Sequence, residues 1–89
     1  MPADHAVVMY TTSWCPYCAR ARQLFGARGV AFREIDVEQV PGSREEMQQR
    51  SGRSTVPQIF IGGQHVGGYD DVHALEQRGE LERLLAAAS

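Results

Sequence analysis

Lysine is absent from this chain of 89 residues, and cysteine occurs only twice. The nine basic residues are therefore all arginines, and with eleven acidic residues they leave a net charge of −2 at pH 7. A charge so close to zero gives no reason to expect a nucleic acid or an anionic membrane as a partner. Because 43% of the residues are hydrophobic and 22% are charged, the composition is that of an ordinary globular protein.

Long apolar runs are also absent. The run from Ala6 to Tyr10 is too short for the core of a signal peptide, the residues before it carry no basic side chain, and no stretch approaches membrane-spanning length. We therefore expect a cytoplasmic protein, in a reducing compartment that keeps paired cysteines available as dithiols. Repeats and linkers are missing as well, so we expect residues 1–89 to form one domain. We also expect a monomer.

The scarcity of metal ligands argues against a metal site. A tetrahedral zinc site needs four ligands, but the chain has no second CxxC motif, and His5, His65 and His73 do not have ligand spacing relative to the cysteines. We therefore expect no metal and interpret each histidine as a surface or packing residue. A structural disulfide is also disfavoured, because a bridge over two intervening residues constrains little of the unfolded chain.

The two cysteines bracket Pro16 and Tyr17 in a CPYC motif, which lies between a short apolar run and a segment with helical periodicity. Proline is favoured at the first position of a helix, so we predict a helix that begins at Pro16 with Cys15 as its N-cap. A sulfur at this position faces free backbone N–H groups and the positive end of the helix dipole, which favour the thiolate over the thiol. We therefore predict that Cys15 is open to solvent, ionised and the nucleophile.

Cys18 is predicted to be the resolving thiol. Residues three apart lie on the same face of a helix, close enough for Cys18 to form a disulfide with Cys15 after a small adjustment. Cys18 lies one turn further into the helix, where fewer N–H groups are free, so we expect it to be less ionised and less exposed than Cys15. A disulfide between them would be easily reduced, which suits thiol exchange better than structural cross-linking.

The rest of the chain alternates strands and helices. The order βαβαββα requires a parallel strand pair joined by a crossover helix, and the Gly62-Gly63 hairpin adds antiparallel strands. We therefore predict an α/β fold with a mixed four-stranded sheet and helices on both faces. The predicted strands are Ala6–Tyr10, Ala31–Asp36, Val56–Ile61 and Gln64–Gly67; the predicted helices are Pro16–Arg28, Ser43–Arg50 with a capping box at Ser43 and Glu46, one capped by Asp70 or Asp71 and running to Arg78, and a last turn or two with Leu81, Leu84 and Leu85.

Three motifs together resemble one protein family. The CPYC motif is followed by Thr55-Val56-Pro57 and then by Gly67-Gly68-Tyr69-Asp70-Asp71, in the order and spacing of the dithiol glutaredoxins and most like their bacterial glutaredoxin 3 type. The resemblance extends over nearly the whole chain. It implies a thioredoxin-like fold and a glutathione-dependent thiol–disulfide oxidoreductase, with glutathione as co-substrate and glutathionylated or disulfide-bearing proteins as clients.

The resemblance also implies a glutathione site. In this family the proline that matches Pro57 follows a cis peptide bond, and the residue that matches Val56 offers its backbone to bound glutathione. The acidic pair at a helix start corresponds to a clamp for the γ-glutamyl end, and Arg53 matches a position that can face the glycyl carboxylate. Taken singly, Asp71 is also consistent with a helix cap and Arg53 with a solvated charge. The implied glutathione-binding residues are Tyr17, Arg53, Thr55, Val56, Pro57, Gly68, Tyr69, Asp70 and Asp71.

Three positions depart from the family pattern, one of them Tyr69, which stands where several relatives have a third cysteine. Thr12 stands where many relatives have a lysine, and Trp14 stands where threonine is common. The tryptophan can be packed in the protein or exposed as a platform for a docking protein. Two other functions stay open at this stage: a carrier of a [2Fe-2S] cluster ligated by Cys15 and glutathione, and a thioredoxin-like reductant supplied by a flavoprotein reductase.

Overall fold

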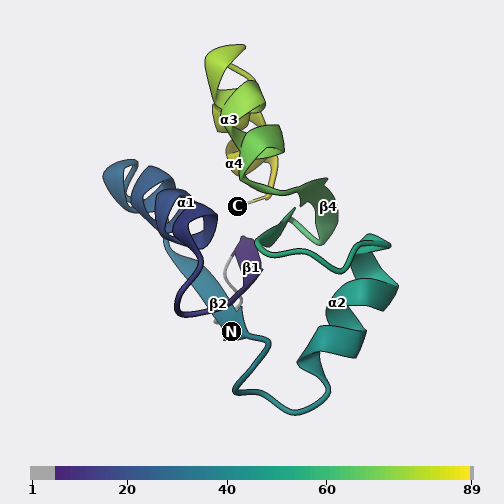
Figure 1. Cartoon of the computed structure of the whole chain (residues 1–89). Coiled ribbons are helices and arrows are strands. Elements are labelled where there is room, and N and C mark those ends of the chain that lie inside the picture. Colours follow the sequence, from purple (N-terminus) through teal and green to yellow (C-terminus); the bar gives the residue numbers. More distant parts are fainter. Residues whose placement is uncertain (1–5, 89) are drawn as a thin grey trace.

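A four-stranded mixed sheet organises residues 6–88, which are the residues that the computed structural model describes (Figure 1). His5 lies outside the described residues. The strands are β1 (Val7–Thr11), β2 (Phe32–Asp36), β3 (Gln58–Ile61) and β4 (Gln64–Gly67), and the helices are α1 (Pro16–Ala27), α2 (Ser43–Ser51), α3 (Tyr69–Gln77) and α4 (Leu81–Ala88). The sheet order is β2-β1-β3-β4, in which β1 and β2 are parallel and the other pairs are antiparallel. The predicted α/β fold is confirmed.

Helices cover both faces of the sheet because side chains along β1 alternate between two apolar cores. Val7 and Met9 point into the larger core, where they pack with residues of α1, α3 and α4. Tyr10 points to the opposite face and packs with Met47 of α2. In Figure 1, α1, α3 and α4 accordingly lie on one side of the sheet and α2 on the other. In this described part of the chain, no helix has both the length and the apolarity that crossing a membrane requires.

The third strand begins later than predicted. It was expected to start at Val56, but β3 starts at Gln58, which pairs with Tyr10 of β1. Proline has no N–H to donate to a ladder, so Pro57 lies before the strand instead of within it. The Val56-Pro57 peptide bond is cis, as the resemblance implied.

Two predicted helix caps are wrong. The N-cap of α2 is Gly42, with φ at +79°, and the Ser43 hydroxyl donates to the Val40 carbonyl at 2.6 Å instead of forming a capping box. Neither aspartate caps α3, because the helix already begins at Tyr69 with Gly68 as its N-cap. Asp71 stabilises the same helix start from inside the helix, since its carboxylate accepts a hydrogen bond from the Gly68 N–H at 2.9 Å.

Candidate active site

The topology brings the three sequence motifs to one edge of the sheet. The CPYC motif follows the carboxyl end of β1. Because β3 runs antiparallel to β1, the Thr55–Pro57 segment before β3 lies at that same edge. β4 runs antiparallel to β3, so the turn from β4 into α3 returns there as well. Segments that are far apart in the sequence therefore surround one site.

Cys15 is the N-cap of α1, as predicted. Its backbone is extended, and its Sγ accepts a hydrogen bond from the Cys18 N–H at 3.4 Å. The expectation of a thiol open to solvent is wrong, because Cys15 is only 8% exposed. Its Sγ lies 3.8 Å from the Val56 carbonyl, so the segment before β3 lies against the sulfur. A substrate therefore has a restricted approach to this sulfur.

Cys18 is fully buried and faces the interior, which agrees with the prediction that it is less exposed than Cys15. Burial, the largest cause, and the neighbouring Cys15 sulfur raise the pKa of the Cys18 thiol from 9.0 to about 12, although the backbone N–H of Thr12 and the charge of Arg22 act in the opposite direction. Arg22 also donates to the Thr12 carbonyl at 3.1 Å and pairs with Glu34. Sequence analysis missed Arg22, although its position one turn after Cys18 places both on the same helix face.

Native Cys18 is expected to react slowly with alkylating agents. A rise of three pKa units lowers the thiolate fraction at pH 8 by about 1,000-fold, and the greater intrinsic nucleophilicity recovers roughly 15- to 30-fold of this. In a Cys15→Ser variant, the Cys15 sulfur no longer raises the pKa of Cys18, but burial, the largest cause, persists. Alkylation of this native variant by iodoacetamide should therefore be roughly 10-fold slower than alkylation of the unfolded variant. Equal rates in native buffer and in denaturant would contradict the buried state of Cys18.

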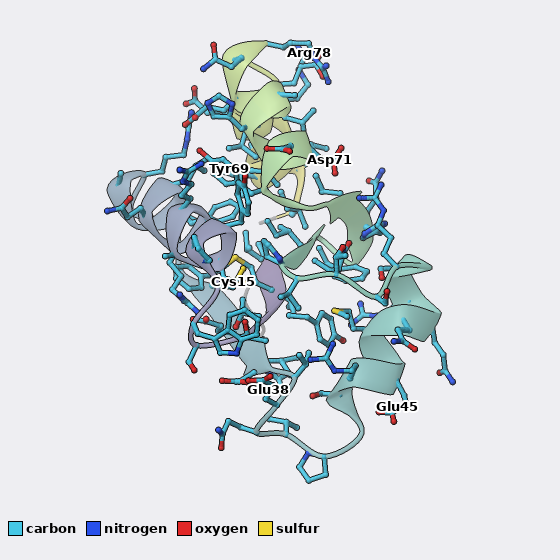
Figure 2. The ribbon with its side chains drawn as sticks, viewed as in Figure 1. Cys15, Glu38, Glu45, Tyr69, Asp71 and Arg78 are labelled. Carbon is cyan, nitrogen blue, oxygen red and sulfur yellow. The ribbon has the colours of Figure 1, made fainter. Side chains whose placement is uncertain are left out.

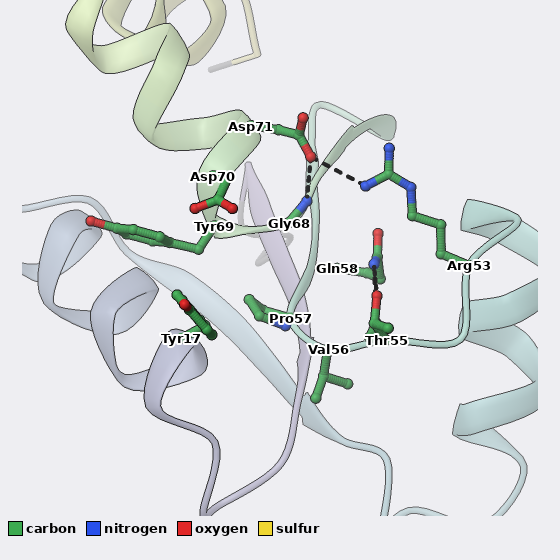
Figure 3. A pocket seen from close by; sticks show the side chains of 10 residues that line it. All are labelled: Tyr17, Arg53, Thr55, Val56, Pro57, Gln58, Gly68, Tyr69, Asp70 and Asp71. Atoms are coloured by element: carbon green, nitrogen blue, oxygen red, sulfur yellow. Dashed lines mark hydrogen bonds and ion pairs between the residues drawn. The ribbon is translucent and has the colours of Figure 1, made fainter.

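A groove of about 280 Å³ opens beside the Cys15 end of α1 (Figure 3). All nine residues that the sequence predicts for glutathione binding line this groove, and their side chains come from α1, the segment before β3 and the start of α3. Gln58 lines it as well and was not predicted. The lining residues are Tyr17, Arg53, Thr55, Val56, Pro57, Gln58, Gly68, Tyr69, Asp70 and Asp71.

One end of the groove carries an ion pair. Arg53 donates to the Asp71 carboxylate at 3.2 Å, and the same carboxylate oxygen accepts the Gly68 N–H (Figure 3). That backbone hydrogen bond and the Arg53 charge hold the pKa of Asp71 below its usual value of 3.8. Gly67 has φ at +132°, and a Cβ at this position would overlap the Asp71 side chain, which requires glycine here. Asp71 is therefore fixed as an anion, and Arg53 is not an isolated solvated charge.

Aromatic side chains form another wall of the groove. The rings of Tyr17 and Tyr69 lie 6.3 Å apart, one from α1 and one from the start of α3. The Arg20 guanidinium lies over the Tyr17 ring at 5.2 Å, and His73 stacks on Tyr69 at 5.6 Å. These contacts hold Tyr69 beside Tyr17 of the cysteine motif, and the two rings limit the width of the groove.

Trp14 lies outside the groove and is 69% exposed, which decides between the two interpretations of this residue in favour of an exposed surface. Its indole N–H donates to Glu38 at 2.9 Å. In Figure 2, Cys15 lies between Glu38 on one side and Tyr69 with Asp71 on the other. The nucleophile therefore has the groove on one side and the Trp14–Glu38 contact on the other.

Among residues 6–88, no three histidine, cysteine or carboxylate side chains come close enough together to hold a metal ion. The two cysteines are both free thiols. As free thiols, Cys15 and Cys18 offer thiol chemistry at this site.

The chain is similar to known glutaredoxins in sequence and in structure. The glutaredoxin family model matches residues 7–66. A glutaredoxin of Pseudomonas aeruginosa is 56% identical over 81 residues, covering 91% of this chain and 96% of that protein, and glutaredoxin 3 of Escherichia coli is 53% identical over 79 residues, covering 89% and 95%. A solved structure of a buckwheat glutaredoxin–glutathione complex matches with a TM-score of 0.88 and 31% identity, covering 94% of this chain and 79% of that one.

Proposed function

The chain belongs to the glutaredoxin family and is a thiol–disulfide oxidoreductase, and we propose that it uses glutathione to reduce protein–glutathione mixed disulfides and protein disulfides. One observation carries this proposal: the Cys15 sulfur accepts a backbone N–H at a helix N-terminus and lies against the Val56 segment that lines the groove. A nucleophilic sulfur and a recessed polar surface thus adjoin each other. We place the reaction in the cytoplasm, where the glutathione pool can return the oxidised enzyme to the dithiol.

In the first step, the Cys15 thiolate attacks the glutathione sulfur of a mixed disulfide. The new bond joins Cys15 to glutathione, the original S–S bond breaks, and the client sulfur leaves with the electron pair and takes up a proton. The thiolate of a second glutathione then attacks the sulfur of the first glutathione, which releases the Cys15 thiolate and forms glutathione disulfide. The N–H groups at the start of α1 stabilise the negative sulfur at the beginning and at the end of this cycle.

The groove offers a matching group for each polar part of glutathione. Asp71 is an anion that can pair with the γ-glutamyl ammonium, and the free N–H groups at the start of α3 can bind the neighbouring carboxylate. The Val56 backbone can pair with the peptide backbone, and the Arg53 guanidinium can bind the glycyl carboxylate once it leaves its ion pair with Asp71. Tyr17, Thr55, Pro57, Gly68, Tyr69 and Asp70 complete the surface around the bound tripeptide.

A protein disulfide needs the second cysteine. Attack by Cys15 leaves a mixed disulfide between this protein and its client, and Cys18 then attacks the Cys15 sulfur and releases the client as a thiol. Because burial keeps Cys18 protonated, this thiol must lose its proton as it attacks, and the Thr12 N–H and the Arg22 charge favour its anionic form. Two glutathione molecules reduce the resulting Cys15–Cys18 disulfide.

Turnover with glutathione tests this proposal. Reduction of a glutathionylated protein is expected when glutathione, glutathione reductase and NADPH are supplied, and little turnover is expected when thioredoxin reductase and NADPH replace them. Turnover with thioredoxin reductase alone would support a thioredoxin-like reductant instead. A visible absorption band of a [2Fe-2S] cluster after anaerobic purification, together with negligible exchange activity, would support a cluster carrier.

Trp14 is proposed to contact the protein part of a glutathionylated client. It is exposed, it lies after the carboxyl end of β1 and directly before Cys15, and it is outside the groove that would hold glutathione. A Trp14→Ala variant is expected to lose roughly 5- to 10-fold in kcat/KM toward a glutathionylated protein, since buried tryptophans dominate many interfaces. The control substrate is the mixed disulfide formed between free cysteine and glutathione, which has no protein part. Its kcat/KM should change less than about 2-fold. An equal loss with both substrates would contradict this role.

A further inference from the structure

Gln58 is a buried polar residue at the start of β3 and is only 1% exposed. Its amide nitrogen donates to the Thr55 carbonyl at 3.0 Å and to the Thr55 hydroxyl at 3.2 Å (Figure 3). On its other side, the amide oxygen lies 2.7 Å from Nε2 of His65. The Gln58 side chain therefore connects two segments that the backbone of the hairpin does not join directly.

The partners fix the direction of this chain of hydrogen bonds. The Thr55 carbonyl can only accept, so the nitrogen of the Gln58 amide must face Thr55 and its oxygen must face His65. An amide oxygen is also only an acceptor, so Nε2 of His65 must carry a proton. His65 therefore donates to Gln58, and Gln58 donates to Thr55.

His65 is itself held in place. It lies on β4, half-buried, with its ring 5.1 Å from the Phe60 ring of β3. Burial lowers the pKa of His65, the Arg53 charge lowers it further, and the Asp71 charge acts in the opposite direction. The ring is accordingly neutral at pH 7, as the tautomer with its proton on Nε2. His65 does not line the groove; its hydrogen bond to Gln58 connects it to the groove, and the charges of the groove residues Arg53 and Asp71 also act on its ring.

The series of hydrogen bonds from His65 through Gln58 ends at Thr55, in the segment that contacts the nucleophile. Thr55 precedes β3 and lies outside the strand ladder, which begins at Gln58. The next residue is Val56, whose carbonyl lies 3.8 Å from the Cys15 sulfur. A Cβ on Gly68 would lie 3.4 Å from the Pro57 carbonyl, so the segment is also in close contact with the start of α3. Its position therefore sets the spacing between the sulfur and the opposite wall of the groove.

We propose that His65 is a positioning residue for glutathione: through Gln58, it holds the Thr55–Pro57 segment at the place where its backbone meets the bound tripeptide. This inference rests on the proposed use of glutathione. It assigns a role to a histidine for which the sequence alone indicates only a surface or packing position. His65 contacts neither cysteine sulfur, so it should not affect the thiol chemistry itself. It should affect the binding of glutathione indirectly, by positioning the segment that lines the groove.

The test is a double-mutant cycle in glutathione-coupled turnover. His65→Phe keeps a ring against Phe60 but has no N–H to donate, so the KM for glutathione is expected to rise roughly 2- to 10-fold while kcat changes little. His65→Gln restores a donor at similar reach and should return KM toward the wild-type value. Because His65 acts through Gln58, His65→Phe should have no further effect in a Gln58→Leu background. Gln64→Ala, an exposed position on the same strand, is the matched control and should leave KM unchanged.

An unchanged KM in a folded His65→Phe variant would overturn the proposal. An equal rise in KM from His65→Phe in the wild-type and Gln58→Leu backgrounds would overturn it as well. If His65→Phe does not fold, the wild-type ring decides: nitrogen NMR should show a neutral ring with the proton on Nε2, and a proton on Nδ1 would overturn the proposal. Failure of the proposed function looks different, because the wild-type protein would then show no glutathione-dependent turnover at all.

Discussion

The Cys15→Ser variant is expected to lose all glutathione-dependent turnover, with mixed disulfides and with protein disulfides alike. Both reactions begin with attack by the sulfur at the start of α1, and a serine hydroxyl is far too weakly acidic to replace it. The fold should persist, because serine is a favoured N-cap and can accept the same N–H hydrogen bond that Cys15 accepts from Cys18. The measurement is NADPH consumption in the coupled assay, with a thermal melt to show that the variant is folded.

Cys18→Ser is the matched control for this prediction. It removes the other thiol of the same helix but leaves the nucleophile and the groove unchanged. Reduction of a glutathionylated protein should continue, since that reaction needs only one protein sulfur, whereas reduction of a protein disulfide by the two-cysteine route should stop. Retained activity in Cys15→Ser, or complete loss of deglutathionylation in Cys18→Ser, would contradict the assigned roles.

Reversal of the charge at Asp71 is expected to have the second largest effect. Asp71→Lys places a cation beside Arg53, at the position where the γ-glutamyl ammonium is proposed to bind. A hydrogen bond to a charged group contributes about 1.5–3 kcal/mol, and the new repulsion adds to its loss, so kcat/KM for glutathione should fall by roughly 100-fold. In Asp71→Asn, which keeps an oxygen to accept the Gly68 N–H, kcat/KM for glutathione should fall by only about 10-fold.

Glu76→Lys is the control for Asp71→Lys. Glu76 lies further along the same helix and pairs with Arg28 at 3.1 Å, much as Asp71 pairs with Arg53 at 3.2 Å. The two variants therefore make the same change in net charge and break a similar ion pair, but Glu76 lies outside the groove. Equal losses in the two variants would show that Asp71 acts through general charge or stability, and would contradict a binding role.

The elements that were predicted correctly depend on local chemistry. Pro16 fits the first turn of a helix wherever it occurs, so the start of α1 and the cap at Cys15 follow from a few adjacent residues. The alternation of strands and helices likewise predicts the mixed sheet. The groove needed more than local chemistry: its residues come from three motifs, and their relation was predicted by resemblance to a family.

The errors arise where distant residues decide the outcome. Cys15 was predicted to be open to solvent, but Val56, 41 residues away in the sequence, lies against its sulfur. Asp71 was predicted as a possible cap, but Gly68 allows α3 to begin earlier, and the carboxylate then binds the Gly68 N–H from within the helix. The link from His65 to Gln58 crosses a hairpin whose register shifts between Ile59 and Phe60, which the sequence pattern does not show. The polar Gln58 within an apolar strand was the one available signal.

The account depends most on Cys15 carrying glutathione during turnover. Trapping this intermediate tests it directly: the Cys18→Ser variant is mixed with a glutathionylated protein, quenched with acid, and analysed by intact mass and peptide mapping. The account predicts a gain of one glutathionyl group on Cys15, formed as the client is released and removed again by reduced glutathione. Continued turnover with Cys15 unmodified throughout, or an adduct that reduced glutathione does not remove, would contradict it.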